Sequence, residues 1–153
     1  MKQILSNLDF QTKGQGFIDI TQEVNLWIKN KKLTQGILLI FLKHTSCSLI
    51  INENADINVL KDLSNYMQAI VPEEKFYPID KSNNKIEYFH SEEGVDDMPA
   101  HIRTMLTSNN LSFSIINGKL EIGIWQAIYI WEHRRSNKSR TLQLHAIGDF
   151  ELD

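Results

Sequence analysis

Two short apolar runs, with polar residues between and after them, limit most strongly the folds open to this chain. Residues 37–42 are too few to span a membrane but have the length of a buried strand. Residues 49–51 form a second β-favouring run, and apolar residues then recur at helical spacing over residues 60–70. The polar stretch 44–56 is therefore predicted to lie between two strands and a helix, on a frame rigid enough to form one wall of a site.

A second strong signal lies near the C-terminal third of the chain. The dipeptide Asn117-Gly118 separates two β-rich runs and is typical of a type I′ turn, so a hairpin is predicted there. Its second arm, residues 120–133, alternates two largely apolar faces with Gln126 as the polar exception. We expect one long central strand, covered on both sides within the chain or on one side by a neighbouring subunit.

These signals combine into an α+β fold in a single domain, residues 1–153, with a mixed, mainly antiparallel β-sheet packed by a few helices. Strands are predicted at residues 4–10, 17–20, 37–42, 49–51, 111–116, 120–133 and 141–147. Gly36 is expected to end the connection into the third of these strands. Helices are predicted near 21–31, over 57–70 and from 97, with N-caps at Thr21, Asp56 and Asp97.

Composition narrows the class of protein. A hydrophobic fraction of 42%, a charged fraction of 23% and a net charge of −3 suit one globular domain and argue against bulk nucleic-acid binding. The single cysteine, Cys47, rules out an intrachain disulfide, suits a reducing compartment and reads as a small packed side chain. Without a signal-peptide pattern or a run of ~20 apolar residues, we expect a soluble, cytoplasmic protein with no membrane association.

The chain has five histidines, three of which stand at positions suited to chemistry. His44 ends a predicted strand, His90 lies in the irregular acidic segment 72–99, and His101 begins a predicted helix. Three neutral imidazoles can hold zinc, and histidines with carboxylates can act as general acid and base on a phosphorylated substrate. We predict that the three histidines share one site; the alternative is three unrelated surface or capping residues.

A basic turn precedes the last predicted strand. Arg134, Arg135, Lys138 and Arg140 could bind phosphate, because guanidinium groups match phosphate oxygens with two hydrogen bonds. A solvated hairpin tip would have the same composition. The chain has neither a phosphate-binding P-loop nor a Rossmann fingerprint, which disfavours nucleotide-cofactor folds.

Three separated motifs occur in order along the chain: the stretch 44–56, the segment 93–102 (EGVDDMPAHI), and the glycine-containing segment 118–128 followed by Glu132-His133-Arg134. Together they resemble the YjbQ-like family, described as secondary thiamine-phosphate synthases. The likeness covers about residues 16–148. It implies an α+β fold and a homotrimer with sites near subunit interfaces. It also implies histidines that bind a divalent metal, zinc or magnesium.

The activity implied by the resemblance joins hydroxymethylpyrimidine diphosphate to thiazole phosphate and releases pyrophosphate. On this basis His44, His101, Glu53 and Asn54 are expected to be catalytic, and His44, His90 and His101 to be metal ligands. Arg134 and Arg140 are expected to stabilise the departing pyrophosphate, and Trp125 to stack on an aromatic ring. The remaining expected substrate-binding residues are Thr45, Asn52, Asp56, Gln126 and Glu132.

The sequence departs from the family pattern at four positions. Ile124 replaces a threonine beside the expected site, and Ser108, Asn110 and Ser114 replace a glycine, a serine and a proline in turn and hairpin positions. Two alternatives to the synthase stay open. One is a metal-assisted hydrolase that uses the same histidines to activate water, and the other is a non-catalytic trimer that binds a phosphorylated metabolite.

Overall fold

Every strand pairing in the computed structural model, which describes residues 2–78 and 84–151, is antiparallel. The strands are β1 (Lys2–Gln11), β2 (Gly16–Asp19), β3 (Leu33–Leu42), β4 (Cys47–Glu53), β5 (Lys75–Phe76), β6 (Ile86–Glu87), β7 (Asn110–Ile116), β8 (Lys119–Leu120), β9 (Gln126–Glu132) and β10 (Ser139–Phe150). The helices are α1 (Thr21–Asn30), α2 (Ile57–Ile70) and α3 (Asp97–Leu106). The predicted α+β class is confirmed.

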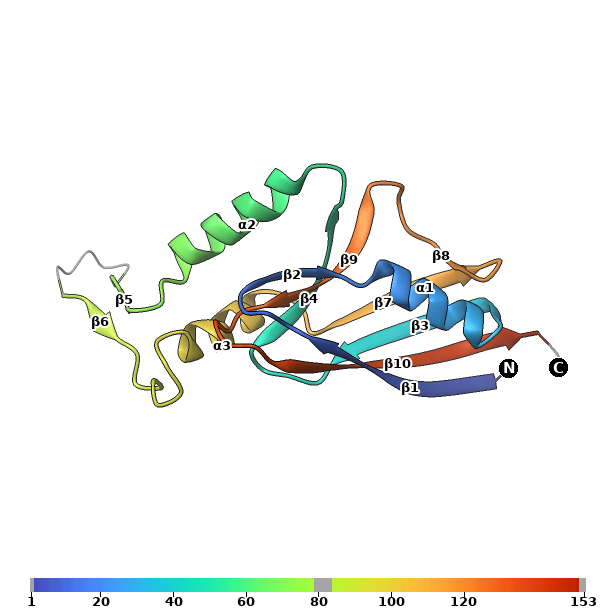
Figure 1. Cartoon of the computed structure of the whole chain (residues 1–153), viewed down its shortest axis with the longest axis horizontal. Coiled ribbons are helices and arrows are strands. Elements are labelled where there is room, and N and C mark those ends of the chain that lie inside the picture. The colour runs from blue at the N-terminus through green and yellow to red at the C-terminus, as the bar shows by residue number, and fades with distance from the viewer. Residues whose placement is uncertain (1, 79–83, 152–153) are drawn as a thin grey trace.

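Two sheets carry the fold (Figure 1). The larger has the strand order β1-β10-β3-β7-β8, and the smaller has the order β2-β9-β4. Alternating residues of β3, such as Leu38 and Ile40, are fully buried, and they pack with Ile128 and Ile130 of β9 and with α1 in one core. The period-2 pattern of the apolar residues thus places one face of each sheet inside. The short pair β5 and β6 lies away from this core, beyond α2 (Figure 1).

The predicted single strand over residues 120–133 is wrong. The chain leaves β8 after Leu120, turns at Ile124 and Trp125, and enters β9 at Gln126, whose side-chain oxygen accepts a 2.7 Å hydrogen bond from Gly123 N. Ile124 is 83% exposed and Trp125 is 63% exposed. The polar residue Gln126 therefore marks the turn, which the apolar alternation around it conceals.

Strand β9 is covered on both faces within one chain. One face belongs to the main core, and the other packs against α2. There Leu60 clusters with Ala127 and Tyr129, and Met67 clusters with Trp131. A neighbouring subunit is not needed to cover this strand. The larger sheet, in contrast, leaves apolar side chains on its outer face, including Ile37 at 58% exposure.

Local turn and cap chemistry agrees with the sequence at two points. Asn117 and Gly118 have φ values of 51° and 73°, which confirms the predicted turn between β7 and β8. The side chain of Asp56 accepts a 2.8 Å hydrogen bond from Asn58 N, which confirms the predicted N-cap of α2.

The two other predicted caps are wrong. The Thr21 hydroxyl accepts a hydrogen bond from Ile128 N, which ties α1 to β9 instead of capping the helix. Helix α3 begins at Asp97 itself, and the residue before it, Asp96, makes no capping hydrogen bond with its side chain. The carboxylate of Asp97 is therefore available to side chains outside the helix. None of the helices in the described residues combines the length and apolar character needed to cross a membrane.

Candidate functional site

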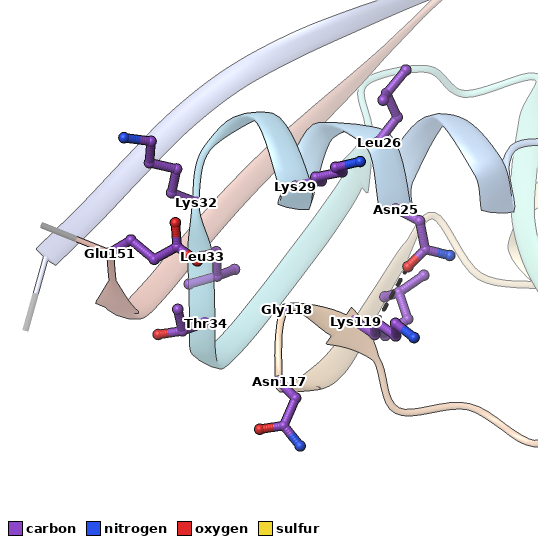
Figure 2. Close-up of a pocket in the computed structure, with 11 residues that line it drawn as sticks. Asn25, Leu26, Lys29, Lys32, Leu33, Thr34, Asn117, Gly118, Lys119 and Glu151 are labelled. Atoms are coloured by element: carbon purple, nitrogen blue, oxygen red, sulfur yellow. Dashed lines mark hydrogen bonds between the residues drawn. The ribbon is translucent and has the colours of Figure 1, made fainter. Parts of the chain in front are cut away.

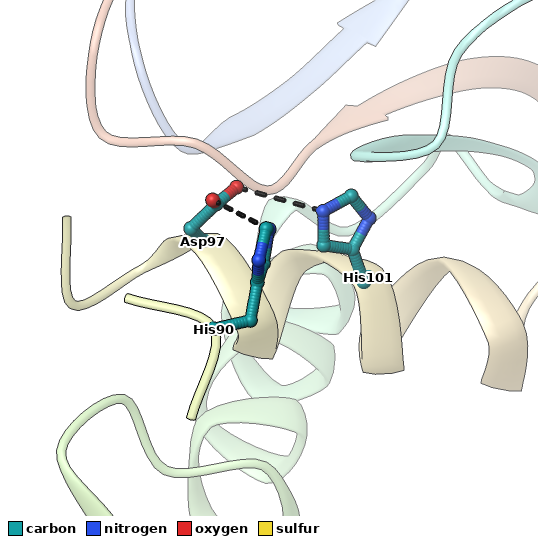
Figure 3. A group of neighbouring side chains, drawn as sticks. All are labelled: His90, Asp97 and His101. Atoms are coloured by element: carbon teal, nitrogen blue, oxygen red, sulfur yellow. Dashed lines mark ion pairs between the residues drawn. The ribbon is translucent and has the colours of Figure 1, made fainter. Parts of the chain in front are cut away.

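His90, Asp97 and His101 bring their side chains together at the start of α3 (Figure 3). Asp97 and His101 are four residues apart and so lie on one face of the helix, while His90 reaches them from the segment after β6. The Nε2 atom of His90 is 2.9 Å from Asp97 Oδ2, and His101 Nε2 is 3.6 Å from Asp97 Oδ1. One ligand atom from each residue falls within 4.8 Å of the others.

The orientation of the His101 ring is fixed by the backbone. Its Nδ1 lies 2.9 Å from the carbonyl oxygen of Thr45, and since a carbonyl only accepts, Nδ1 carries the proton. In a neutral His101, the Nε2 atom that faces Asp97 is consequently unprotonated. A lone pair and a carboxylate oxygen then face each other, and a cation between them would relieve the repulsion.

Asp97 is 2% exposed, and its two oxygens have different surroundings. Oδ1 pairs with the Arg134 guanidinium, whereas Oδ2 has no aligned hydrogen-bond donor among the described residues, although it lies at ion-pair distance from His90. The histidine ring is therefore the neighbour of Oδ2 on the side away from Arg134. The three side chains thus offer two imidazole nitrogens and one carboxylate oxygen to a common point.

Arg134 and Arg140 hold the carboxylates around this cluster. Arg134 Nε donates to Asp96 Oδ2 at 3.0 Å, and Arg140 makes two hydrogen bonds to Glu132, at 2.7 and 2.6 Å. Burial alone would raise the pKa of Asp96, but hydrogen bonds from the Arg135 backbone and the Arg134 guanidinium lower it below its ordinary value. Both arginines are 5% exposed, so they position internal carboxylates and present little surface to a pyrophosphate.

His44, expected in the same site, has other partners. Its Nε2 accepts a 2.8 Å hydrogen bond from Thr141 N, and burial together with the positive charge of Arg140 lowers its pKa. Among the described residues, the potential metal group holds His90 and His101 with Asp97, not His44, in the third place. The spacing of Asp97 and His101 on one helix face is the signal from which this third member could have been found.

The predicted site residues fall into two groups at opposite ends of β4 and β9. Cys47 pairs with Glu132 at the end that carries Thr45 and the histidine cluster, and Glu53 pairs with Gln126 at the other end. Six residues of strand at ~3.3 Å each separate the two ends by roughly 20 Å. Within one chain, Asn52, Glu53, Asn54, Asp56, Trp125 and Gln126 therefore lie apart from the histidines.

The far end of the molecule carries a larger hollow, about 730 Å³ in volume (Figure 2). It lies between α1 and the β7–β8 turn and is lined by Leu33, Leu120 and three lysines, Lys29, Lys32 and Lys119. None of the site residues predicted from the sequence lines it, and its charged groups are long side chains at the surface. We therefore place the candidate site at the histidine cluster.

The fold and the site define the class: a two-sheet antiparallel α+β protein with a His–Asp–His cluster beside the smaller sheet. Residues 6–149 match the family described as UPF0047 protein YjbQ-like, and the chain belongs to this family. A UPF0047 protein from Synechocystis sp. is 37% identical over 90% of this chain and 87% of its own. The UPF0047 protein YjbQ from Escherichia coli O157:H7 is 34% identical over 88% of this chain and 91% of its own.

Solved structures agree. An uncharacterized YjbQ/UPF0047 family protein from Clostridium acetobutylicum matches with a TM-score of 0.75 and 28% identity, covering 94% of this chain and 99% of that one. A YbjQ-like protein of unknown function from Sulfolobus solfataricus matches with a TM-score of 0.76 over 97% of this chain and 100% of that one. At 18% identity, the latter likeness concerns the fold alone.

Proposed function

We propose that this protein is a metal-dependent enzyme that holds a divalent ion at His90, Asp97 and His101 and hydrolyses a phosphorylated small molecule. The observation that carries the proposal is the convergence of the buried Asp97 carboxylate with two imidazole nitrogens, since one ligand atom of each residue lies within 4.8 Å of the others. Two histidines and one carboxylate form a ligand set found in zinc hydrolases and in non-haem iron proteins. Magnesium prefers oxygen ligands throughout, so zinc suits this set better.

Each neighbouring residue has a definite part in such a site. The Thr45 carbonyl keeps the proton of His101 on Nδ1, so that Nε2 is free to bind an ion. Arg134 pairs with Oδ1 of Asp97 and leaves Oδ2 as the ligand atom. A bound zinc ion supplies Lewis acidity and makes water a nucleophile near neutral pH. The exposed guanidinium of Arg135, paired with Glu73 at 2.5 Å, lies in the neighbouring loop and can meet a phosphate.

Thiamine-phosphate synthase activity is the second candidate. It is supported by Trp125, which stands 63% exposed at the turn before β9, where its face can stack on a heteroaromatic ring. The backbone N–H of Asn54 donates a 3.0 Å hydrogen bond to the Trp125 carbonyl, which holds Asn54 beside this turn. In this proposal the two groups of site residues, separated within one chain, meet across the subunit interface of a homotrimer.

Metal content tests the first proposal. Wild-type protein should bind one zinc ion per chain, measured by equilibrium dialysis and elemental analysis, and His101→Ala should lose it while keeping its circular dichroism spectrum. His145→Ala is a matched control, because His145 lies on β10 and bonds to Gln3 of β1, outside the cluster. Zinc binding should weaken as pH falls through ~6.5, where free imidazole becomes protonated. Wild-type protein that binds no zinc would overturn the proposal.

Product analysis separates the two activities. A hydrolase should release phosphate from phosphomonoesters in a zinc-dependent reaction that His101→Ala abolishes. A synthase should release pyrophosphate only when both the pyrimidine and thiazole substrates are present, and Trp125→Ala should then impair it while leaving zinc content unchanged. Pyrophosphate release that persists in zinc-free protein would favour the synthase.

A further inference from the structure

A small cavity, distinct from the histidine cluster, lies between α2, α3 and the end of β9. Its volume is about 200 Å³. The polar residues that line it include Ser64 and Gln68 of α2, Arg103 of α3, and Glu132 and His133 at the end of β9. Arg103, Glu132 and His133 are each at most 3% exposed, so the cavity has a buried polar wall and an exposed rim on α2. Such a wall needs partners for its hydrogen-bonding groups.

The hydrogen-bonding capacity of Arg103 is only partly used. Its two terminal nitrogens donate to Glu73 at 3.2 Å and to the Val71 carbonyl at 2.9 Å. Its Nε is buried without a hydrogen-bond partner among the described residues. Glu73 also pairs with Arg135 at 2.5 Å, so two guanidinium groups share one carboxylate. Glu73 thus serves two guanidinium groups, and the N–H of Arg103 Nε is left without an acceptor.

The other ionisable groups of the wall already have partners of their own. Both oxygens of Glu132 accept hydrogen bonds from Arg140, which neutralises the carboxylate. The Nε2 atom of His133 lies 2.5 Å from the Ser48 hydroxyl. Burial, followed by the positive charges of Arg103 and Arg140, lowers the pKa of His133 to about 3. The buried wall therefore presents a neutral histidine and a guanidinium N–H that lacks an acceptor.

We propose that this cavity binds a phosphate-sized oxyanion, with Arg103 as the charged partner and Gln68 and Ser64 as neutral hydrogen-bonding groups at its rim. A buried guanidinium with an unsatisfied N–H suits an oxyanion because charge-assisted hydrogen bonds to oxygen are strong. The inference is independent of the proposed metal site, since none of the three metal-cluster residues lines this cavity.

A titration with inorganic phosphate, followed by ³¹P NMR in the presence of a metal chelator, tests the site. Wild-type protein should bind one phosphate per chain. Gln68→Glu, which places a negative charge at the exposed rim, should weaken binding by about tenfold or more, because like charges repel at this distance. Gln22→Glu makes the same chemical change on the exposed side of α1 and should bind as the wild type does.

A second variant tests the charged partner. Arg103→Lys keeps the positive charge but loses the planar fork, and it should also bind phosphate more weakly. If this buried substitution prevents folding, the Gln68→Glu variant still tests the proposed oxyanion site, because Gln68 lies at the surface and its replacement should not disturb folding. Wild-type protein without saturable phosphate binding, or Gln68→Glu protein that binds like the wild type, would overturn the inference.

Two further arms separate related explanations. His90→Ala should lose zinc but keep phosphate binding, so failure of the metal proposal and failure of this one are distinguishable. Glycerol phosphate that binds as tightly as inorganic phosphate would assign the cavity to the phosphate group of a larger ligand. Binding of inorganic phosphate alone would assign it to the free ion, and both results support an oxyanion site.

Discussion

Replacing the buried His133 with glutamine should make the stability of the protein less sensitive to mild acid. In the folded state the pKa of His133 is lowered to about 3, whereas in the unfolded chain it returns to ~6.5. Between these values the unfolded state binds a proton that the folded state does not, so the free energy of unfolding falls as pH falls. From pH 7 to pH 5 this single group should remove about 2 kcal/mol, since each pKa unit corresponds to about 1.4 kcal/mol.

Urea denaturation at pH 7 and pH 5, at one protein concentration and in phosphate-free buffer with a chelator, measures this difference. His133→Gln is expected to be less stable than the wild type at pH 7, because the contact with Ser48 changes. Its loss of stability between the two pH values should nevertheless be about 2 kcal/mol smaller than that of the wild type. His44, whose pKa is also lowered, is present in both proteins and cancels in the comparison.

The matched control is His145→Gln. His145 lies on the outer side of β10 and bonds to Gln3, so this substitution makes the same chemical change away from Ser48 and Arg103. If wild-type and His133→Gln proteins lose the same free energy between pH 7 and pH 5, the reasoning is refuted, and His133 is not held neutral by its surroundings.

Three other outcomes are expected. Arg140→Met should lower the free energy of unfolding, measured by urea denaturation, by about 3–5 kcal/mol, because the Glu132 carboxylate stays buried without this guanidinium. The double variant with Glu132→Leu should recover part of the lost stability, and a double variant that recovers none would contradict this explanation. Gly36→Ala should lower the melting temperature more than Gly118→Ala, because only at Gly36 would a Cβ overlap a neighbouring strand; the reverse order would contradict the geometry. Light scattering should give the trimer that the family resemblance implies, in which the outer sheet face with Ile37 could be covered; a monomer mass would oppose it.

Local patterns predicted the elements well where one physical cause dominated. The helix over 57–70 was placed correctly because its apolar spacing and its Asp56 cap agree. Strand β3 begins at Leu33, earlier than predicted, because Gly36 lies inside the strand opposite Gly148 and does not end a connection. A glycine in sequence favours a break, whereas here the absence of a side chain lets two backbones approach closely.

The candidate site was predictable in residue type more than in arrangement. His90 and His101 were expected to share a site, and they do lie together. Asp97 was expected to cap a helix, because sequence alone cannot tell a capping carboxylate from one that faces a histidine. The buried pair of Ser48 and His133 joins residues 85 positions apart, and the sequence around either residue does not predict the contact.

The separation of the two groups of polar residues was, in hindsight, contained in the sequence. Residues 44–45 precede strand β4, and residues 52–56 lie at its other end and just beyond it; an extended chain keeps the two ends of a strand apart. Because similar polar residue types occur at both ends of the strand, the sequence suggested that they form one site. The length of the strand between them favours two separate groups of residues, which only another chain could bring together.

The three members of the histidine cluster are unequally anchored. Asp97 and His101 stand on a helix. His90 comes from a segment whose described part is held by single hydrogen bonds such as those from the Tyr88 hydroxyl to the Pro72 carbonyl and from Arg134 to the Glu93 carbonyl. His90 itself is half-exposed. Local opening of such a segment requires far less free energy than global unfolding. An ion that binds all three side chains would therefore act as a clasp on this segment, and hydrogen exchange there would slow in proportion to ion occupancy while the sheets kept their rates.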